Sequence, residues 1–419
     1  MQNTTVISIL AAIILIIASC SVFAQTGVFV VTKFGAMADG ITDDTDAFLK
    51  AIEAASKYEK GAKIIVPAGK YRLTKPLTLE AVLLTGLDTG AWPSDIASMP
   101  TINVDHTEKP CIIAKNGASI NGLNFDYAFR QKNSNIHAPT IQLSGIGVSI
   151  TNVRMQSPYE GIVADGTSNV GRLNIENVFI VSAQKTGVFV TGTWDIPTIR
   201  NVEVWNICEY SQRNSTGFKF GYNDEMRLTD CFAFACKIGY HFIGYEQEPG
   251  KIGGSWGGMT GCSADFCGQG VVIEKAVNLR IVGGSFWAHG NAIRVAGEGR
   301  VTISGSDLKG NGAPALVVDD CTSLTVTGCG LGKAGESWAH IPNARINNKS
   351  GTVLLNACTF DQNSIGVEIG EDADNFSIAN NVFAPSPYES IIDNSANTAN
   401  KIINNNLMKK IEQTKEDTK

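Results

Sequence analysis

A five-residue unit recurs along this chain and restricts its fold more than any other feature of the sequence. Each copy begins with a small or polar residue and continues with alternating apolar and polar positions. The copies lie about 20 to 30 residues apart, which is the length of one coil of a β-solenoid. They occupy residues 152–156, 177–181, 201–205, 230–234, 261–265, 283–287, 305–309, 357–361 and 380–384, with a less regular copy near 327–331.

The alternation inside each copy has the period of a β-strand, so the second and fourth positions face a core and the third and fifth face outward. Val153 and Met155 illustrate the buried pair. Two further short strands accompany each copy, as at 173–175 and 187–190, with Gly and Asn at the corners. The sequence therefore predicts an all-β, three-sheet parallel β-helix. A β-sandwich or propeller would need hairpin turns or blade-length repeats, which do not occur.

The N-terminal part of the expected helix differs from the coils. Thr42 to Thr45 offer side-chain oxygens to a helix start, and the apolar residues that follow have helical spacing: Ala47, Phe48, Ala51, Ile52 and Ala55. We expect a short helix within a cap at about 34–60, covering the open end of the solenoid. The β-helix itself should form a single domain over 28–408, followed by a charged tail at 409–419.

The composition excludes some classes of protein. The chain has 43 Gly, only 18% charged residues and a net charge of −6, and it lacks a basic block, which argues against nucleic acid as a partner. Ten cysteines are present, and the gap between Cys231 and Cys236 recurs between Cys262 and Cys267. Because a residue type that recurs at one phase of a solenoid stacks on itself, we expect small buried hydrophobes here. No zinc-ligand spacing is present, and we predict no metal site.

The first residues resemble a targeting segment. Val6 to Ala18 is an unbroken apolar run, and 22–24 suit a signal-peptidase site, although no Lys or Arg precedes the run. We therefore expect a signal peptide at 1–24 and a secreted or periplasmic protein. The alternative is a lipobox ending at Cys20, whose lipidation would anchor the protein to the outer membrane or cell surface.

Two segments, 34–48 (FGAMADGITDDTDAF) and 66–71 (VPAGKY), closely resemble the N-terminal signature of the pectate-lyase-like superfamily, which includes polygalacturonase-related proteins and many phage tailspikes. The resemblance implies a right-handed β-helix that cleaves or binds polysaccharides. It does not fix the reaction, because members include hydrolases, lyases, epimerases, transferases and non-catalytic binders. Within the signature, Asp39, Asp43 and Asp44 are expected to be turn and capping residues.

The catalytic motifs of the best-known members cannot be carried over to this chain. Asp319 and Asp320 form the nearest match to the polygalacturonase Asp pair, but they follow a different strand, and 288–290 only partly match the histidine motif. The other two polygalacturonase motifs are absent. The clustered carboxylates and catalytic Arg of calcium-dependent pectate lyases are not evident either.

The stacking of coils itself predicts a candidate site. Equivalent outward positions of successive coils form ladders, which place aromatic rings beside carboxylates on one face. Rings stack on the apolar faces of sugars, while carboxylates bind hydroxyls or transfer protons. The candidate catalytic residues are Asp265 (the first choice), Glu203 and Asp307; the candidate substrate-binding residues are Trp205, Phe234, Trp287, His289, Arg294 and Lys309. The alternative is a face covered by a loop or by neighbouring subunits of a homotrimer.

A second acidic group lies in and before the long segment 244–258. It comprises Asp224, Glu225, Glu246 and Glu248, with Trp256 nearby. Such an insertion either builds a wall of the binding groove or forms a solvated surface loop.

Together these features predict a polysaccharide-cleaving enzyme, a glycoside hydrolase with paired carboxylates. The alternatives are a polysaccharide lyase acting by β-elimination and a non-catalytic carbohydrate-binding or adhesive β-helix. We expect no cofactor for a hydrolase, and calcium only for a lyase.

Overall fold

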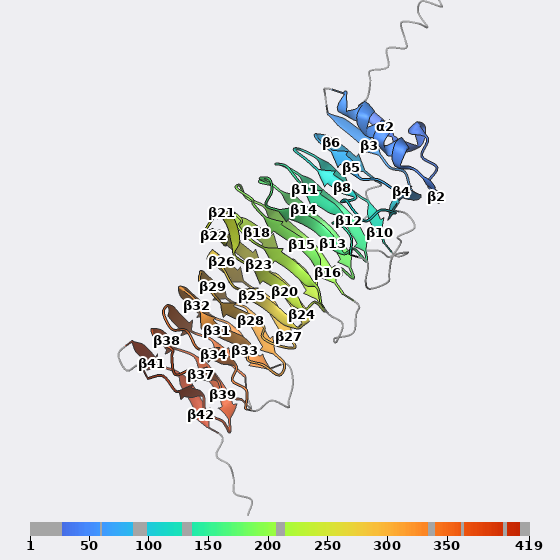
Figure 1. Ribbon diagram of the computed structural model, residues 1–419. Helices are drawn as coiled ribbons and strands as arrows, with labels where there is room; N and C mark the ends of the chain where they lie inside the picture. The colour runs from blue at the N-terminus through green and yellow to red at the C-terminus, as the bar shows by residue number, and fades with distance from the viewer. Residues whose placement is uncertain are drawn as a thin grey trace, which may run out of the picture.

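The computed structural model describes residues 27–58, 61–86, 99–127, 136–206, 214–333, 340–361, 364–396 and 400–410. The predicted signal peptide with Cys20, and residues 411–419 of the predicted tail, lie outside this range. The described residues form one long stack of parallel coils, with β1 at one end of the stack and β42 at the other (Figure 1). The predicted right-handed parallel β-helix is confirmed. No helix in the described part is long and apolar enough to cross a bilayer.

Each coil contributes strands to three lines that run the length of the stack. The first line contains β1 (Val28–Val30), β3 (Ala62–Ile65), β6 (Val82–Thr85), β9 (Ser119–Asn121), β12 (Ser149–Gln156), β14 (Asn174–Val181), β16 (Thr198–Trp205), β18 (Met226–Thr229), β23 (Ser255–Thr260), β26 (Ala276–Val282), β29 (Arg300–Ser304), β32 (Ser323–Thr327), β35 (Thr352–Asn356), β38 (Phe376–Ala379) and β41 (Lys401–Asn404).

The second line follows the first around a corner. It contains β2 (Asp39–Asp43), β4 (Lys70–Leu73), β7 (Thr101–Val104), β10 (Asn124–Asp126), the C-terminal halves of β12, β14 and β16, then β19 (Phe232–Phe234), β24 (Ser263–Cys267), β27 (Ser285–Ala288), β30 (Asp307–Gly310), β33 (Gly330–Lys333), β36 (Thr359–Phe360), β39 (Val382–Ser386) and β42 (Leu407–Lys410).

The third line completes each coil. It contains β5 (Leu77–Leu79), β8 (Ile112–Ala114), β11 (Ile141–Leu143), β13 (Glu160–Asp165), β15 (Thr186–Thr191), β17 (Thr216–Phe220), β20 (Ile238–Phe242), β25 (Gln269–Ile273), β28 (Ile293–Ala296), β31 (Leu316–Asp320), β34 (Ala344–Ile346), β37 (Val367–Ile369) and β40 (Ile391–Asp393).

The hydrogen bonding modifies the predicted three separate sheets. The third line is a 13-stranded sheet, but the first and second lines together form one 27-stranded sheet. The reason is that β12, β14 and β16 are single eight-residue strands that continue through the corner.

That corner depends on residues that accept a left-handed backbone. Asn152, Asn177 and Asn201 all have φ close to +50°. Their side chains form a ladder of hydrogen bonds, in which each amide donates to the Asn of the preceding coil. In later coils the same corner is occupied by glycines, at 261, 283, 305 and 328, which adopt positive φ without steric cost. The predicted role of Asn and Gly at the corners is confirmed.

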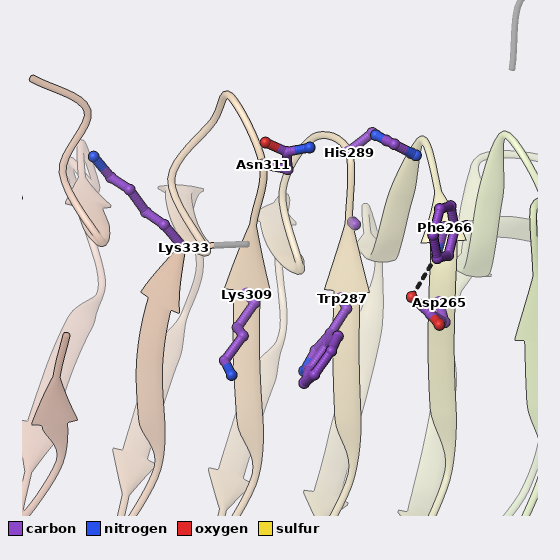
Figure 2. A pocket seen from close by; sticks show the side chains of 8 residues that line it. Asp265, Phe266, Trp287, His289, Lys309, Asn311 and Lys333 are labelled. Atoms are coloured by element: carbon purple, nitrogen blue, oxygen red, sulfur yellow. Dashed lines mark hydrogen bonds between the residues drawn. The ribbon is translucent and has the colours of Figure 1, made fainter. Parts of the chain in front are cut away.

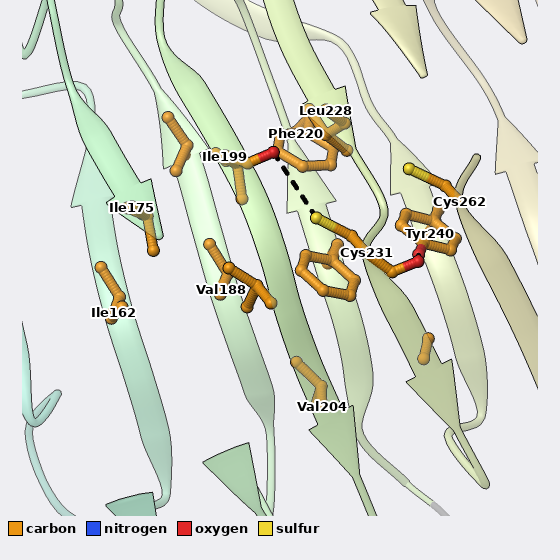
Figure 3. Close-up of a cluster of buried hydrophobic side chains, with 14 of the residues drawn as sticks. Ile162, Ile175, Val188, Ile199, Val204, Phe220, Leu228, Cys231, Tyr240 and Cys262 are labelled. Atoms are coloured by element: carbon orange, nitrogen blue, oxygen red, sulfur yellow. Dashed lines mark hydrogen bonds between the residues drawn. The ribbon is translucent and has the colours of Figure 1, made fainter. Parts of the chain in front are cut away.

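The interior of the solenoid is filled by stacked apolar side chains, as Figure 3 shows for its middle coils. Phe218 and Tyr240, from adjacent coils, stack with ring centroids 4.9 Å apart. Cys231 and Cys262 are buried and free, as predicted, and Cys231 Sγ lies 3.6 Å from the carbonyl oxygen of Ile199. Burial of each such side chain contributes roughly 1.5–3 kcal/mol, so the stack itself stabilises the fold.

The N-terminal end is closed by α2 (Thr45–Ser56), which follows the short 3₁₀ helix η1 (Val31–Phe34). Phe48 and Ala51 are completely buried against the first coils, as predicted for the cap. Asp43 accepts the Thr45 N–H at 3.0 Å, whereas Asp44 accepts the Met37 N–H at 2.7 Å and makes no capping bond to the helix. Asp44 therefore ties the preceding turn to the helix start.

Candidate functional site

The outward side chains of the second line form the predicted ladders. Trp205, Phe234 and Asp265 are partners in register, and Trp287 pairs with Lys309 one coil further on. The other ladder runs from Glu203 through three intervening coils to Asp307. We call this surface the ladder face. It carries all the predicted site residues except His289, in the turn after β27, and Arg294.

Arg294 does not belong to the ladder face. It lies on β28 in the third line, and its Nε donates to Asp319 Oδ2 at 2.7 Å. The chain turns a corner between Trp287 and Arg294, so the two side chains point outward from different sides of the coil. The prediction that Arg294 lies near the acids and rings of the site is wrong for this reason.

A pocket of about 380 Å³ opens on the ladder face at the C-terminal ends of four adjacent strands. We call it the ladder pocket. Figure 2 shows its side chains arriving from β24, β27, β30 and β33 in succession, with His289 and Asn311 in the turns above. Four predicted site residues line it, together with four that sequence reasoning missed: Asp265, Trp287, His289 and Lys309, and then Phe266, Ala288, Asn311 and Lys333.

Trp287 is held in place at the middle of this pocket while 42% of it remains exposed. Its Nε1 donates to Asp307 Oδ2 at 2.9 Å, which fixes the orientation of the ring. Lys309 Nζ lies 4.4 Å from the ring centroid and 3.6 Å from Asp307 Oδ2. Asp307 and Lys309 thus hold the indole from one side and leave the rest of its surface exposed.

Phe266 occupies a strained position at the edge of the pocket. The register between β24 and β27 shifts here, and Phe266 has φ of +53° with half of the residue exposed. The equivalent corner residues of three earlier coils also have positive φ, so this conformation belongs to the solenoid, although a bulky residue there costs about 1–3 kcal/mol. The ring lies 5.6 Å from both Phe234 and His289. The extra residue of the bulge therefore supplies a second exposed aromatic surface beside Asp265.

Asp361 approaches the pocket across β33, whose Gly330 and Gly332 carry no side chains. In the register of β33 and β36, Asp361 lies next to Gly332, and a Cβ atom at Gly332 would collide with the Asp361 carboxylate. Partial burial, together with the negative charge of Asp307, raises the pKa of Asp361, while Lys309 opposes the shift. Asp361 is at the fifth, outward position of its repeat, as predicted. Because Gly332 in the preceding coil has no side chain, the Asp361 carboxylate can extend over it towards Lys309.

Lys333 is a further cation at this end of the pocket. Burial lowers the pKa of Lys333, and its Nζ has no hydrogen-bond partner among the described residues. Within the same described range, no three His, Cys, Asp or Glu side chains gather closely enough to hold a metal ion.

An aromatic strip leads along the ladder face towards the pocket. Trp205 lies 6.0 Å from Phe179 and 5.6 Å from Phe234, measured between ring centroids. Glu203 lies beside this strip, and burial raises the pKa of its carboxyl group. Glu203 is therefore outside the ladder pocket, two coils before Asp265.

The predicted acidic insertion lies at another corner. Its residues form the hairpin β21 (Tyr245–Glu248) and β22 (Lys251–Gly253), between the third and first lines. Figure 1 shows this hairpin on the opposite edge of the stack from β24 and β27. Trp256 Nε1 donates to Asp224, and Arg280 donates to Glu225. The segment does not form a wall of the ladder pocket.

Solved structures with the same fold span nearly the whole chain. The A-module of a mannuronan C-5 epimerase from Azotobacter vinelandii matches with a TM-score of 0.57 and 16% identity, over 91% of this chain and 99% of that one. The catalytic unit of an α-1,3-glucanase from Streptomyces thermodiastaticus matches with a TM-score of 0.52 and 16% identity, over 91% and 70%. At these identities the likeness shows the fold alone.

Curated relatives match over a shorter stretch. A probable polygalacturonase from Arabidopsis thaliana is 41% identical over 59 residues, and one from Vitis vinifera is 44% identical over 71 residues. The matches cover 14% of this chain and only 13% and 14% of those proteins.

The sequence profile of one family matches residues 28–240, just over half of the chain. The matched part includes the N-terminal cap and the aromatic strip, and it ends before the residues that line the ladder pocket. This chain belongs to the rhamnogalacturonase A/epimerase, pectate lyase-like family.

Proposed function

We propose that the protein is a carbohydrate-active enzyme that cleaves a polysaccharide in the ladder pocket as a glycoside hydrolase. The observation that carries this proposal is the exposed Trp287 with carboxylates on both sides, Asp265 one coil before it and Asp307 one coil after it. Membership of the family and the polygalacturonase, epimerase and glucanase relatives support the same class of substrate.

The environments of the carboxyl groups suggest their roles. A general acid must hold its proton at working pH, and the pKa of Asp361 is raised by burial and by Asp307. Asp361 is therefore our candidate for the acid that protonates the leaving oxygen. Asp307, whose Oδ2 lies 3.6 Å from Lys309 Nζ, is the candidate for the base that activates water, since it lies close enough to Asp361 to influence its pKa. Asp265 lies four coils before Asp361, roughly 19 Å away, which is too far for an acid–base pair, so we assign it to binding sugar hydroxyls in the pocket.

One observation favours elimination as a second candidate reaction. Lys333 is a buried amine with a lowered pKa, which suits a base that removes a proton next to a sugar carboxylate. The calcium expected for a lyase has no cluster of acidic ligands within the described residues, and no step of this alternative uses it.

We further propose that the protein acts outside the cytoplasm, where polysaccharides are encountered. The apolar run and cleavage site at 1–24 support export, and Cys20 supports a lipid anchor as the alternative. The mass of the mature protein from a native host tests the two. A cut after residue 24 supports the soluble form, and a lipidated Cys20 supports the anchored form.

Incubation with a panel of plant, algal and bacterial polysaccharides tests the reaction. New reducing ends without ultraviolet absorbance from an unsaturated product mean hydrolysis, and reducing ends with that absorbance mean elimination. Binding without any new reducing end contradicts cleavage of the polymer and favours the non-catalytic carbohydrate-binding protein.

A further inference from the structure

A second depression, of about 510 Å³, opens near the N-terminal end of the stack. We call it the N-terminal depression. Polar side chains from four adjacent coils line it, namely Asp39, Lys70, Thr101, Asn124 and Asp126. These residues belong to strands of the second line, which places the depression on the same face as the ladder pocket.

Asn124 is the unusual residue of this depression. It is only 2% exposed, and its Nδ2 donates to Thr101 Oγ1 at 3.1 Å. Its Oδ1 is buried and has no hydrogen-bond partner among the described residues. Exchanging the amide oxygen and nitrogen would not help, because one polar atom would still be left over.

Arg154 repeats this situation on the neighbouring strand. It pairs in register with Asn124 and is 7% exposed, and its Nη2 donates to Gln156 Oε1 at 3.0 Å. The Arg154 Nε is buried and has no partner in the described part of the chain. Burial lowers the pKa of Arg154, as expected when water is removed from a cation.

Buried polar groups in native proteins are almost always hydrogen-bonded, so two unsatisfied ones on adjacent strands call for a ligand. One is an amide acceptor and the other a guanidinium donor. A hydroxyl group is suited to such a place, because it offers a donor to the amide oxygen and an acceptor to a guanidinium. The surrounding Asp39, Asp126 and Lys70 add further acceptors and a donor, the mixture that a polyhydroxylated sugar binds.

The aromatic strip connects this depression with the ladder pocket. Arg154 Cζ lies 5.8 Å from the Phe179 ring centroid, and Phe179 is followed by Trp205 and Phe234. The register leads from Asp126 to Asp265 in five coil steps. At about 4.8 Å a step, the two sites are roughly 24 Å apart, a span that an oligosaccharide or polymer bridges.

We infer that the N-terminal depression is a distal sugar-binding subsite, in which Asn124 binds a hydroxyl of the same polymer that reaches the ladder pocket past the half-buried rings of Trp205 and Phe234. The binding part of this inference stands on the unsatisfied groups and the cavity. Only the statement that the bound polymer is also cleaved rests on the proposed function.

The test compares two asparagines three positions apart. Asn124→Ala removes one unsatisfied acceptor and one hydrogen bond, to Thr101, so the melting temperature should fall less than in the control below, while affinity for the bound polysaccharide falls about tenfold, by ~1.4 kcal/mol. Asn121→Ala is the matched control, because Asn121 Oδ1 accepts from Thr151 and Asn152 and its Nδ2 donates to Thr85. Its melting temperature should fall while affinity is unchanged. Affinity electrophoresis and titration calorimetry with the panel polysaccharides measure the binding.

The outcomes separate this inference from the proposed function. Unchanged affinity in Asn124→Ala overturns the subsite. A loss of stability equal to that of Asn121→Ala overturns it as well. Failure of the wild type to bind any panel polymer has the same consequence. If the wild type releases no product but its binding depends on Asn124, the subsite stands and the proposed enzyme fails. If the polymer is cleaved, the loss of kcat/KM in Asn124→Ala should be larger for long chains than for a disaccharide.

Discussion

The outer surfaces of the second and third lines have the same strand geometry but different chemistry. On the third line, charged residues pair with a residue of an adjacent coil: Arg294 with Asp319, and Arg345 with Glu368 at 2.8 Å. Lys219 lies over the ring of Phe189, 5.2 Å from its centroid. The outward groups of this face therefore satisfy one another.

The ladder face is arranged differently. The pKa of Glu203 is raised by burial alone, Trp287 and Phe266 are about half exposed, and the face is hollowed at two places. Stacking produces ladders on both faces, so a ladder of charges or rings does not by itself indicate a site. A ladder that leaves rings exposed and buried polar groups unsatisfied is the more specific signal, and the third line provides a control surface without these features.

The largest expected effect comes from the proposed acid. Asp361→Asn should lower kcat by about 10²-fold or more, since a general acid contributes that much, while the fold remains intact. Asp319→Asn, on the third line, should leave kcat unchanged. Initial rates on the polysaccharide that the panel identifies measure both, and equal effects of the two substitutions would remove the distinction between the faces.

Removing the central ring should have the next largest effect. Trp287→Ala should raise KM about tenfold, or ~1.4 kcal/mol, because the exposed indole is the proposed stacking surface. Phe189→Ala removes an outward ring of the third line and should leave KM unchanged. If Phe189→Ala raised KM and Trp287→Ala did not, the substrate would bind to the third line and not to the ladder face.

The pH dependence should change by a smaller amount. Activity should fall as pH rises through the raised pKa of Asp361, because the acid loses its proton there. Lys309 lowers that pKa, so Lys309→Gln should raise it and move the basic limb of the pH–rate profile to higher pH. Arg345→Gln is the control and should leave the limb in place. A limb that stays fixed or moves to lower pH in Lys309→Gln would exclude Asp361 as the acid.

The smallest effect is expected on the third line itself. Arg294→Gln breaks a partly exposed ion pair with Asp319, so the free energy of unfolding should change by no more than about 1 kcal/mol. Activity should not change. Denaturant unfolding measures the free energy of unfolding, and initial rates measure the activity. A large loss of activity would show that Arg294 belongs to the functional site after all.

The sequence predicts the coil pattern and much of the site because a period of two fixes which side chains face outward, and the repeat fixes which of them stack. Trp287 and Lys309 could be placed in this way. Arg294 could not be placed correctly, because it is only seven residues from Trp287 in the sequence and yet lies on a different side of the coil. Phe266 was missed since the bulge adds a residue that breaks the alternation. Lys333 could be recognised as a site residue only from the structure, which shows that its amine is buried.

A crystal structure of Asp361→Asn with an oligosaccharide of the identified polymer tests the central claim most directly. The account predicts sugar rings along the ladder face, stacked on Trp287 and Phe266 and extending past Trp205 towards Asn124. A sugar chain bound over the third line, or one that avoids these aromatic residues, would contradict it.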